Sequence, residues 1–69
     1  MTYVFIGIDG VYKAYGDDLY EVAKDLDLPP GSYRVYSTSL MPDELISSRN
    51  IFMDNHLTFI MTYTRTAGA

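Results

Sequence analysis

The first fifteen residues have the composition and spacing of two β-strands joined by a turn. Residues 2–8, TYVFIGI, are mostly β-branched or aromatic, and residues 11–15, VYKAY, resume an alternating pattern after Asp9-Gly10. An Asp-Gly pair favours the positive φ angles of a two-residue turn between antiparallel strands. The pattern therefore predicts a β-hairpin that turns at Asp9 and Gly10.

The spacing of apolar residues becomes helical after Gly16. Asp18 followed three residues later by Glu21 is typical of an N-cap with a capping box. The next apolar residues fall within about 100° of one another around a helix; they are Leu19, Val22, Ala23 and Leu26. Pro29-Pro30-Gly31 then ends the pattern, because proline cannot continue a helix. One short amphipathic helix with a single buried stripe is predicted.

The second half of the chain predicts further strands. Residues 32–38, SYRVYST, and residues 56–65, HLTFIMTYTR, are rich in β-branched and aromatic residues. Simple alternation in the last strand places four apolar side chains on one face; they are Leu57, Phe59, Met61 and Tyr63. Between these strands, Pro42, Asp43 and Glu44 predict a helical turn, and residues 51–53 predict a short strand followed by a tight turn at 54–55.

The predicted fold class is α+β, in a single domain that spans residues 1–69. We expect a small antiparallel β-sheet of about five strands in the order ββαββ(β), with the amphipathic helix packed on one face. A helix of about ten residues is about 15 Å long and covers only that face. The other face must then be covered by the loop at 40–50, by a second copy or by a partner. Tyrosines make up seven of the ten aromatic residues, which suits an interface, although strand propensity alone also explains them.

Charge is unevenly distributed along the chain. The net charge of -4 argues against direct binding to nucleic acid or to an anionic membrane, because both require clustered lysines and arginines. Residues 9–27 contain six acidic residues and two lysines, whereas three acidic residues balance three arginines elsewhere. The whole negative excess therefore lies in residues 9–27.

Four carboxylates of this segment share one side of the predicted helix, and we call them the acidic face: Asp17, Asp18, Glu21 and Asp25. The helix dipole stabilises anions near the N-terminus by about 0.3–1 kcal/mol each, which explains the first three. Asp25 and Asp27 lie instead where basic residues would complement the dipole, which indicates a binding surface. Tyr15 and Tyr20 flank the acidic face in sequence and are candidate anchors. The candidate partner-binding residues are thus Tyr15, Asp17, Asp18, Tyr20, Glu21, Asp25 and Asp27, and a solvated face that only aids solubility is the alternative.

The sequence offers little for catalysis or for cofactor binding. The chain has no cysteine and His56 is its only histidine, so neither a zinc site nor a cysteine nucleophile is expected. The glycines do not match nucleotide-binding loops. No apolar run approaches the roughly 18 residues of a membrane span, and the first residues lack the features of a signal peptide. We expect a cytoplasmic, non-enzymatic protein without catalytic residues, metal or cofactor, and no membrane partner.

In size, in the hairpin at Asp9-Gly10 and in its acidic face, the chain resembles the small acidic phage-encoded anti-CRISPR proteins. The resemblance implies a non-enzymatic inhibitor in the cytoplasm of the host cell. Its acidic surface would dock on the positively charged DNA-binding groove of a CRISPR effector and exclude DNA by mimicry. The implied partner is a basic protein surface, a CRISPR effector subunit, and both monomer and homodimer remain open. One alternative is a homo-oligomeric structural or accessory phage or bacterial protein that uses its bare sheet face as an interface. Another is an antitoxin-like regulator of a basic protein.

Overall fold

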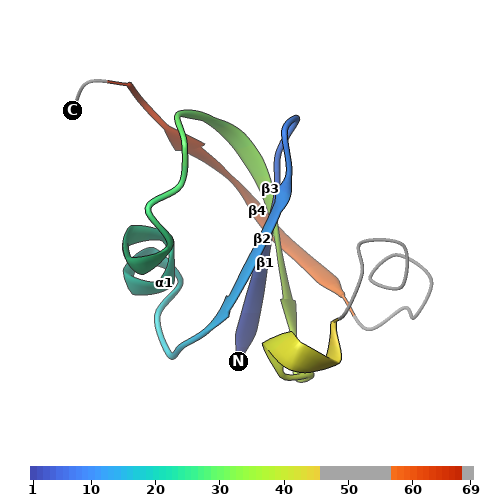
Figure 1. Ribbon diagram of the computed structural model, residues 1–69. Helices are drawn as coiled ribbons and strands as arrows, with labels where there is room; N and C mark the ends of the chain where they lie inside the picture. Colours follow the sequence, from blue (N-terminus) through green and yellow to red (C-terminus); the bar gives the residue numbers. More distant parts are fainter. Residues whose placement is uncertain (46–56, 68–69) are drawn as a thin grey trace.

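The computed structural model describes residues 1–45 and 57–67 of the chain (Figure 1). The elements in chain order are β1 (Thr2–Ile6), β2 (Val11–Tyr15), α1 (Leu19–Leu26), β3 (Gly31–Thr38), the 3-10 helix η1 (Pro42–Glu44) and β4 (Thr58–Arg65). The strands form an antiparallel sheet in the order β2-β1-β3-β4. The α+β class and the order ββαββ are confirmed. The described sheet has four strands rather than five, and the strand expected at 51–53 lies outside the described residues.

The β1–β2 hairpin turns one residue earlier than the sequence predicts. The ladder continues past both strand ends, because the Gly7 N–H donates a hydrogen bond to the Gly10 carbonyl at 2.9 Å. Ile8 and Asp9 therefore form the tip, and neither has a positive φ, so the predicted turn at Asp9-Gly10 was wrong. Of the two glycines next to this turn, Gly7 is the one that the packing requires, because an added Cβ there would lie 2.8 Å from two ring carbons of Tyr33.

Helix α1 packs on one face of the sheet through the predicted stripe. Its residues Leu19, Val22 and Ala23 are buried in a cluster with Phe5 and Val35 of the two central strands. The helix ends at Leu26, before the prolines, because the next residue adopts the left-handed conformation that terminates helices. Leu28, which follows that residue, is also buried in the cluster, although it lies outside the helical stripe.

The opposite face of the sheet is covered in part by the chain that follows β3. Leu45, directly after η1, is buried against Val4 of β1, with Leu40 packed beside them. The Lys13 ammonium group on β2 donates a hydrogen bond to the Leu45 carbonyl and ties this segment to the sheet. Figure 1 shows η1 and α1 on opposite sides of the twisted sheet. The sequence left three possibilities for covering this face: the loop at 40–50, a second copy or a partner. In the described residues, residues 40–45 of that loop cover part of it.

Strand β4 contains a β-bulge that changes which face its side chains occupy. Ile60 has no partner in β3, because the pairing passes from Met61 directly to Phe59. Met61 and Tyr63 consequently pack against the cluster under α1, whereas Leu57 packs in the cluster on the other face. The single apolar face predicted for Leu57, Phe59, Met61 and Tyr63 was therefore wrong, since one extra residue reverses the alternation.

Candidate partner-binding surface

Two of the four carboxylates of the acidic face precede the helix. Asp18 is the N-cap, with an extended backbone, and its carboxylate accepts a hydrogen bond from the Tyr20 N–H at 2.9 Å. The predicted N-cap is confirmed. Among the described contacts the Asp18 N–H donates no hydrogen bond to the Glu21 carboxylate, so the predicted capping box is not formed. Asp17 lies one residue further from the helix, so Asp17 and Asp18 do not share a side of the helix with Glu21 and Asp25 as the sequence predicts.

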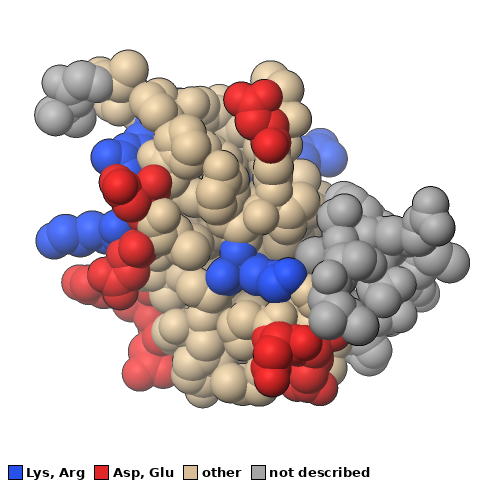
Figure 2. Space-filling model, in the orientation of Figure 1, with Lys and Arg blue, Asp and Glu red and all other residues tan. Residues whose placement is uncertain are grey.

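Glu21 and Asp25 lie on the helix itself and are both exposed. They are four residues apart, so they lie on the same side of α1. At about 1.5 Å per residue, they are separated by about 6 Å along the helix axis. Neither forms an ion pair with another described residue. Figure 2 shows several acidic side chains along the left edge of the molecule with basic side chains among them, and separate acidic groups at the top and at the lower right. Lys24 is the exposed basic residue of the last turn of α1. The positive charge of Lys24 therefore interrupts the negative surface that these carboxylates form.

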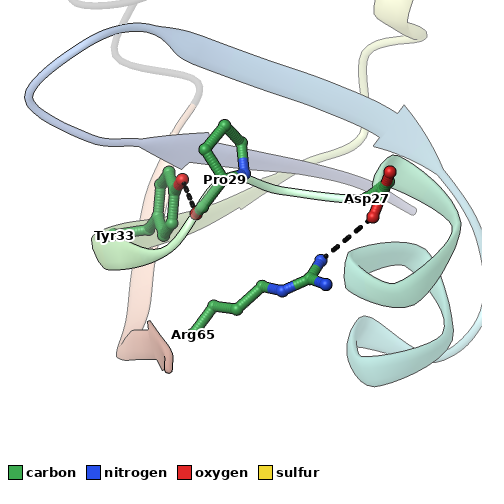
Figure 3. A network of polar contacts seen from close by, with 4 residues as sticks. All are labelled: Asp27, Pro29, Tyr33 and Arg65. Carbon is green, nitrogen blue, oxygen red and sulfur yellow. Dashed lines mark hydrogen bonds and ion pairs between the residues drawn. The ribbon is translucent and has the colours of Figure 1, made fainter. Parts of the chain in front are cut away.

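Asp27 has a different environment from the other candidates. It is the C-cap of α1, with a left-handed φ of 52°, and its carboxylate lies 3.3 Å from the Arg65 guanidinium (Figure 3). Both groups are exposed, and such a pair contributes about 0–1 kcal/mol. The arginine offsets the charge of Asp27, which makes this residue the weakest candidate for contact with a basic partner. The sequence contained no signal for this pair, because it depends on the pairing of Gly31 with Arg65 at the end of β4.

The two tyrosines proposed as anchors lie on different surfaces. Tyr15, 55% exposed, ends β2 opposite Thr2, on the sheet face that points away from α1. Tyr20, 62% exposed, lies on α1, where its ring centroid is 6.4 Å from that of Tyr63. The two tyrosines flank the acidic face in sequence, but strand alternation turns the Tyr15 side chain to the sheet face that points away from α1.

A buried tyrosine holds the connection between α1 and β3. The Tyr33 hydroxyl donates a hydrogen bond to the Pro29 carbonyl, and the side chain is only 5% exposed (Figure 3). Burial raises the pKa of Tyr33 above its ordinary value of 10.0, and the neighbouring Tyr12 and Asp9 raise it further, against the opposing effect of Arg65. Tyr33 stays protonated near neutral pH, so its hydroxyl remains a hydrogen-bond donor.

Neither metal ligation nor similarity to known proteins identifies the chemistry of this surface. Within residues 1–45 and 57–67, aspartate and glutamate side chains form no group of three that could hold a metal ion. No helix in the described part of the chain is both long enough and apolar enough to cross a membrane. Comparisons with protein-family models, with curated proteins and with solved structures found no match for this chain. Its function is therefore argued from the described surface.

Proposed function

We propose that this chain is a non-enzymatic binding protein that docks through its acidic face on a basic protein surface. In its specific form, the proposal is an anti-CRISPR-like inhibitor that occupies the DNA-binding groove of a CRISPR effector and excludes DNA. The observation that carries it is the exposure of Glu21 and Asp25 without a described ion pair, in a chain whose net charge is -4.

The spacing of these two carboxylates supports mimicry of a nucleic-acid strand. Glu21 and Asp25 are separated by about 6 Å along the helix axis. Two successive steps of one DNA strand, at about 3.4 Å each, cover a similar rise. Asp17 and Asp18 extend the negative charge beyond the start of α1, and both are exposed. A lysine- or arginine-lined groove could therefore contact a short row of carboxylates in place of phosphates.

The test measures DNA binding by a panel of purified CRISPR effector complexes in the presence of this chain. We expect DNA binding to fall at a molar ratio near one and to recover when DNA is added in excess, because both ligands compete for one groove. The inhibition should weaken as salt rises, since exposed charges more than about 10 Å apart are screened at 0.1 M ionic strength. Unchanged DNA binding across the whole panel would refute the inhibitor proposal.

A pair of matched variants assigns the effect to the acidic face. Glu21→Gln combined with Asp25→Asn changes the net charge by +2 on the helix, and Asp43→Lys changes it by the same amount on η1. We expect the first variant to lose inhibition and the second to keep it. Asp18 is left unchanged because its carboxylate caps the helix, so its reversal would confuse binding with stability. Equal inhibition by both variants would exclude the acidic face as the docking surface.

One observation favours the homo-oligomeric alternative. Phe59 and Ile60 on the outer strand β4 are 52% and 43% exposed, which is a large apolar area for a strand at the edge of the described sheet. If copies associate there, light scattering after size exclusion should give a mass above the 7.8 kDa of one chain. This mass should rise with protein concentration and should not fall at high salt, because apolar association is not weakened by salt. Ile60→Lys should then restore the monomer mass, and a monomer at all concentrations would exclude this function.

A further inference from the structure

A small cavity lies at the tip of the β1–β2 hairpin, away from the acidic face. Its volume is about 90 Å³, and it opens between the hairpin turn and the connection from α1 to β3. Gly7 and Asp9 line it from the turn, Tyr12 from β2, and Pro29 and Tyr33 from the other side. Binding sites for drug-sized molecules usually have volumes of about 300–1,000 Å³, so this cavity fits a single side chain.

The walls of the cavity are held in place by contacts within the fold. The rings of Tyr12 and Tyr33 pack edge to face with centroids 6.1 Å apart, and Tyr33 is fixed by its hydrogen bond to the Pro29 carbonyl. On the turn side, the absence of a side chain at Gly7 lets the Tyr33 ring lie against the backbone. The site is therefore preformed, with aromatic and proline surfaces that need no rearrangement to bind a ligand.

The cavity has one acidic residue in its lining, Asp9, whose side chain is exposed to a ligand. Asp9 is exposed at the tip of the hairpin, close enough to Tyr33 for its carboxylate to raise the pKa of that phenol. Arg65 is the basic group whose charge also acts on Tyr33, but its guanidinium lies against Asp27 and does not line the cavity. The carboxylate of Asp9 has no ion-pair partner among the described residues.

We propose that this cavity receives an arginine side chain of a partner protein, with Asp9 as its counter-ion. A guanidinium group is planar, stacks on aromatic faces and binds a carboxylate through two parallel hydrogen bonds, which matches tyrosine and proline walls with one carboxylate at the rim. The inference deepens the proposed function, because it names a side chain by which a basic partner is held. It rests on that function only for the basic character of the partner.

The site is tested on the whole chain by NMR titration with N-acetyl-arginine N-methylamide at low salt. The backbone amides of Gly7, Gly10 and Gly31 line the cavity and report on binding, whereas Gly16 does not line it and serves as an internal control. We expect saturable shifts of the first three signals and none at Gly16. The citrulline analogue has the same shape without the charge, and it should bind about five- to tenfold more weakly.

Two variants separate the carboxylate from the net charge of the protein. Asp9→Asn should weaken binding of the arginine derivative by about five- to tenfold, and Asp43→Asn, the same change on η1, should leave it unchanged. Absence of saturable shifts at the three glycines, equal binding of citrulline, or equal binding by Asp9→Asn would each overturn the proposal. Neither variant alters the acidic face, so the cavity and the proposed inhibitor function can fail independently.

Discussion

Gly7→Ala is expected to destabilise the protein, because the Tyr33 ring occupies the space that the new methyl group needs. The added Cβ would lie 2.8 Å from both Cδ2 and Cε2 of the ring. The ring cannot move away easily, since Tyr33 is buried and its hydroxyl is held by the Pro29 carbonyl. Overpacking of this kind typically costs about 1–3 kcal/mol of unfolding free energy.

Gly10→Ala is the matched control in the same hairpin. An added Cβ there would meet its nearest atom, Cε1 of Tyr12, at 3.7 Å, which is ordinary van der Waals contact, and Gly10 has no positive φ. Alanine also restricts the unfolded chain, so this variant should be neutral or more stable by about 0.4–1 kcal/mol. The two substitutions add the same methyl group, and only their surroundings differ.

Thermal unfolding followed by circular dichroism measures both variants under the same conditions. For a domain of this size, a loss of about 1 kcal/mol corresponds to a fall of about 4–8 °C in melting temperature. We expect Gly7→Ala to melt at least that much below Gly10→Ala. Equal stabilities of the two variants would show that the close packing of Tyr33 on Gly7 does not constrain the hairpin.

Three further predictions concern a helix end, a buried hydroxyl and a titrating phenol. Asp27→Gly should raise the unfolding free energy by about 0.5 kcal/mol, because glycine adopts the left-handed C-cap conformation without strain, and thermal melting would contradict this if the variant were less stable. Thr2→Val should stabilise by about 1 kcal/mol in urea unfolding, since the Thr2 hydroxyl is buried without a hydrogen-bond partner in the described part of the chain; a loss of stability would imply that the hydroxyl has one. The raised pKa of Tyr33 means that the folded state holds the phenol proton more tightly than the unfolded chain. Its contribution to stability is therefore complete below a pH of about 10 and declines as the pH rises through the folded pKa. The free energy of unfolding should fall less for Tyr33→Phe than for the wild-type protein between pH of about 8 and about 11. Equal falls would show that the Tyr33 phenol does not have a raised pKa in the folded state.

The elements that the sequence predicted well are those specified by local signals. The N-cap at Asp18 and the apolar stripe of α1 depend on residues close together in the chain, and both are present. The strands β2 and β3 also lie within one residue of their predicted bounds, because β2 lies between Gly10 and Gly16 and the β-branched and aromatic run of β3 begins directly after Pro29-Pro30-Gly31.

The features that the sequence did not predict depend on pairing between distant segments. The bulge at Ile60 follows from the register of β4 on β3, which no periodicity in β4 alone reveals. The hairpin turn was predicted one residue too late, because Asp9-Gly10 is a typical turn pair. The need for glycine at position 7 comes instead from the Tyr33 ring, which is distant in sequence. In the same way, the neutralising contact of Arg65 with Asp27 joins residues that are 38 positions apart in the chain.

The bulge at Ile60 also affects how the outer border of β4 presents itself to other chains. A regular strand of eight residues would offer an incoming strand one uninterrupted row of amide and carbonyl groups. Here the row is divided at Ile60 into two shorter stretches that are out of phase with each other. An added strand could match either stretch but not both, so the extra residue at Ile60 limits how much of this edge of the described sheet another chain could pair with.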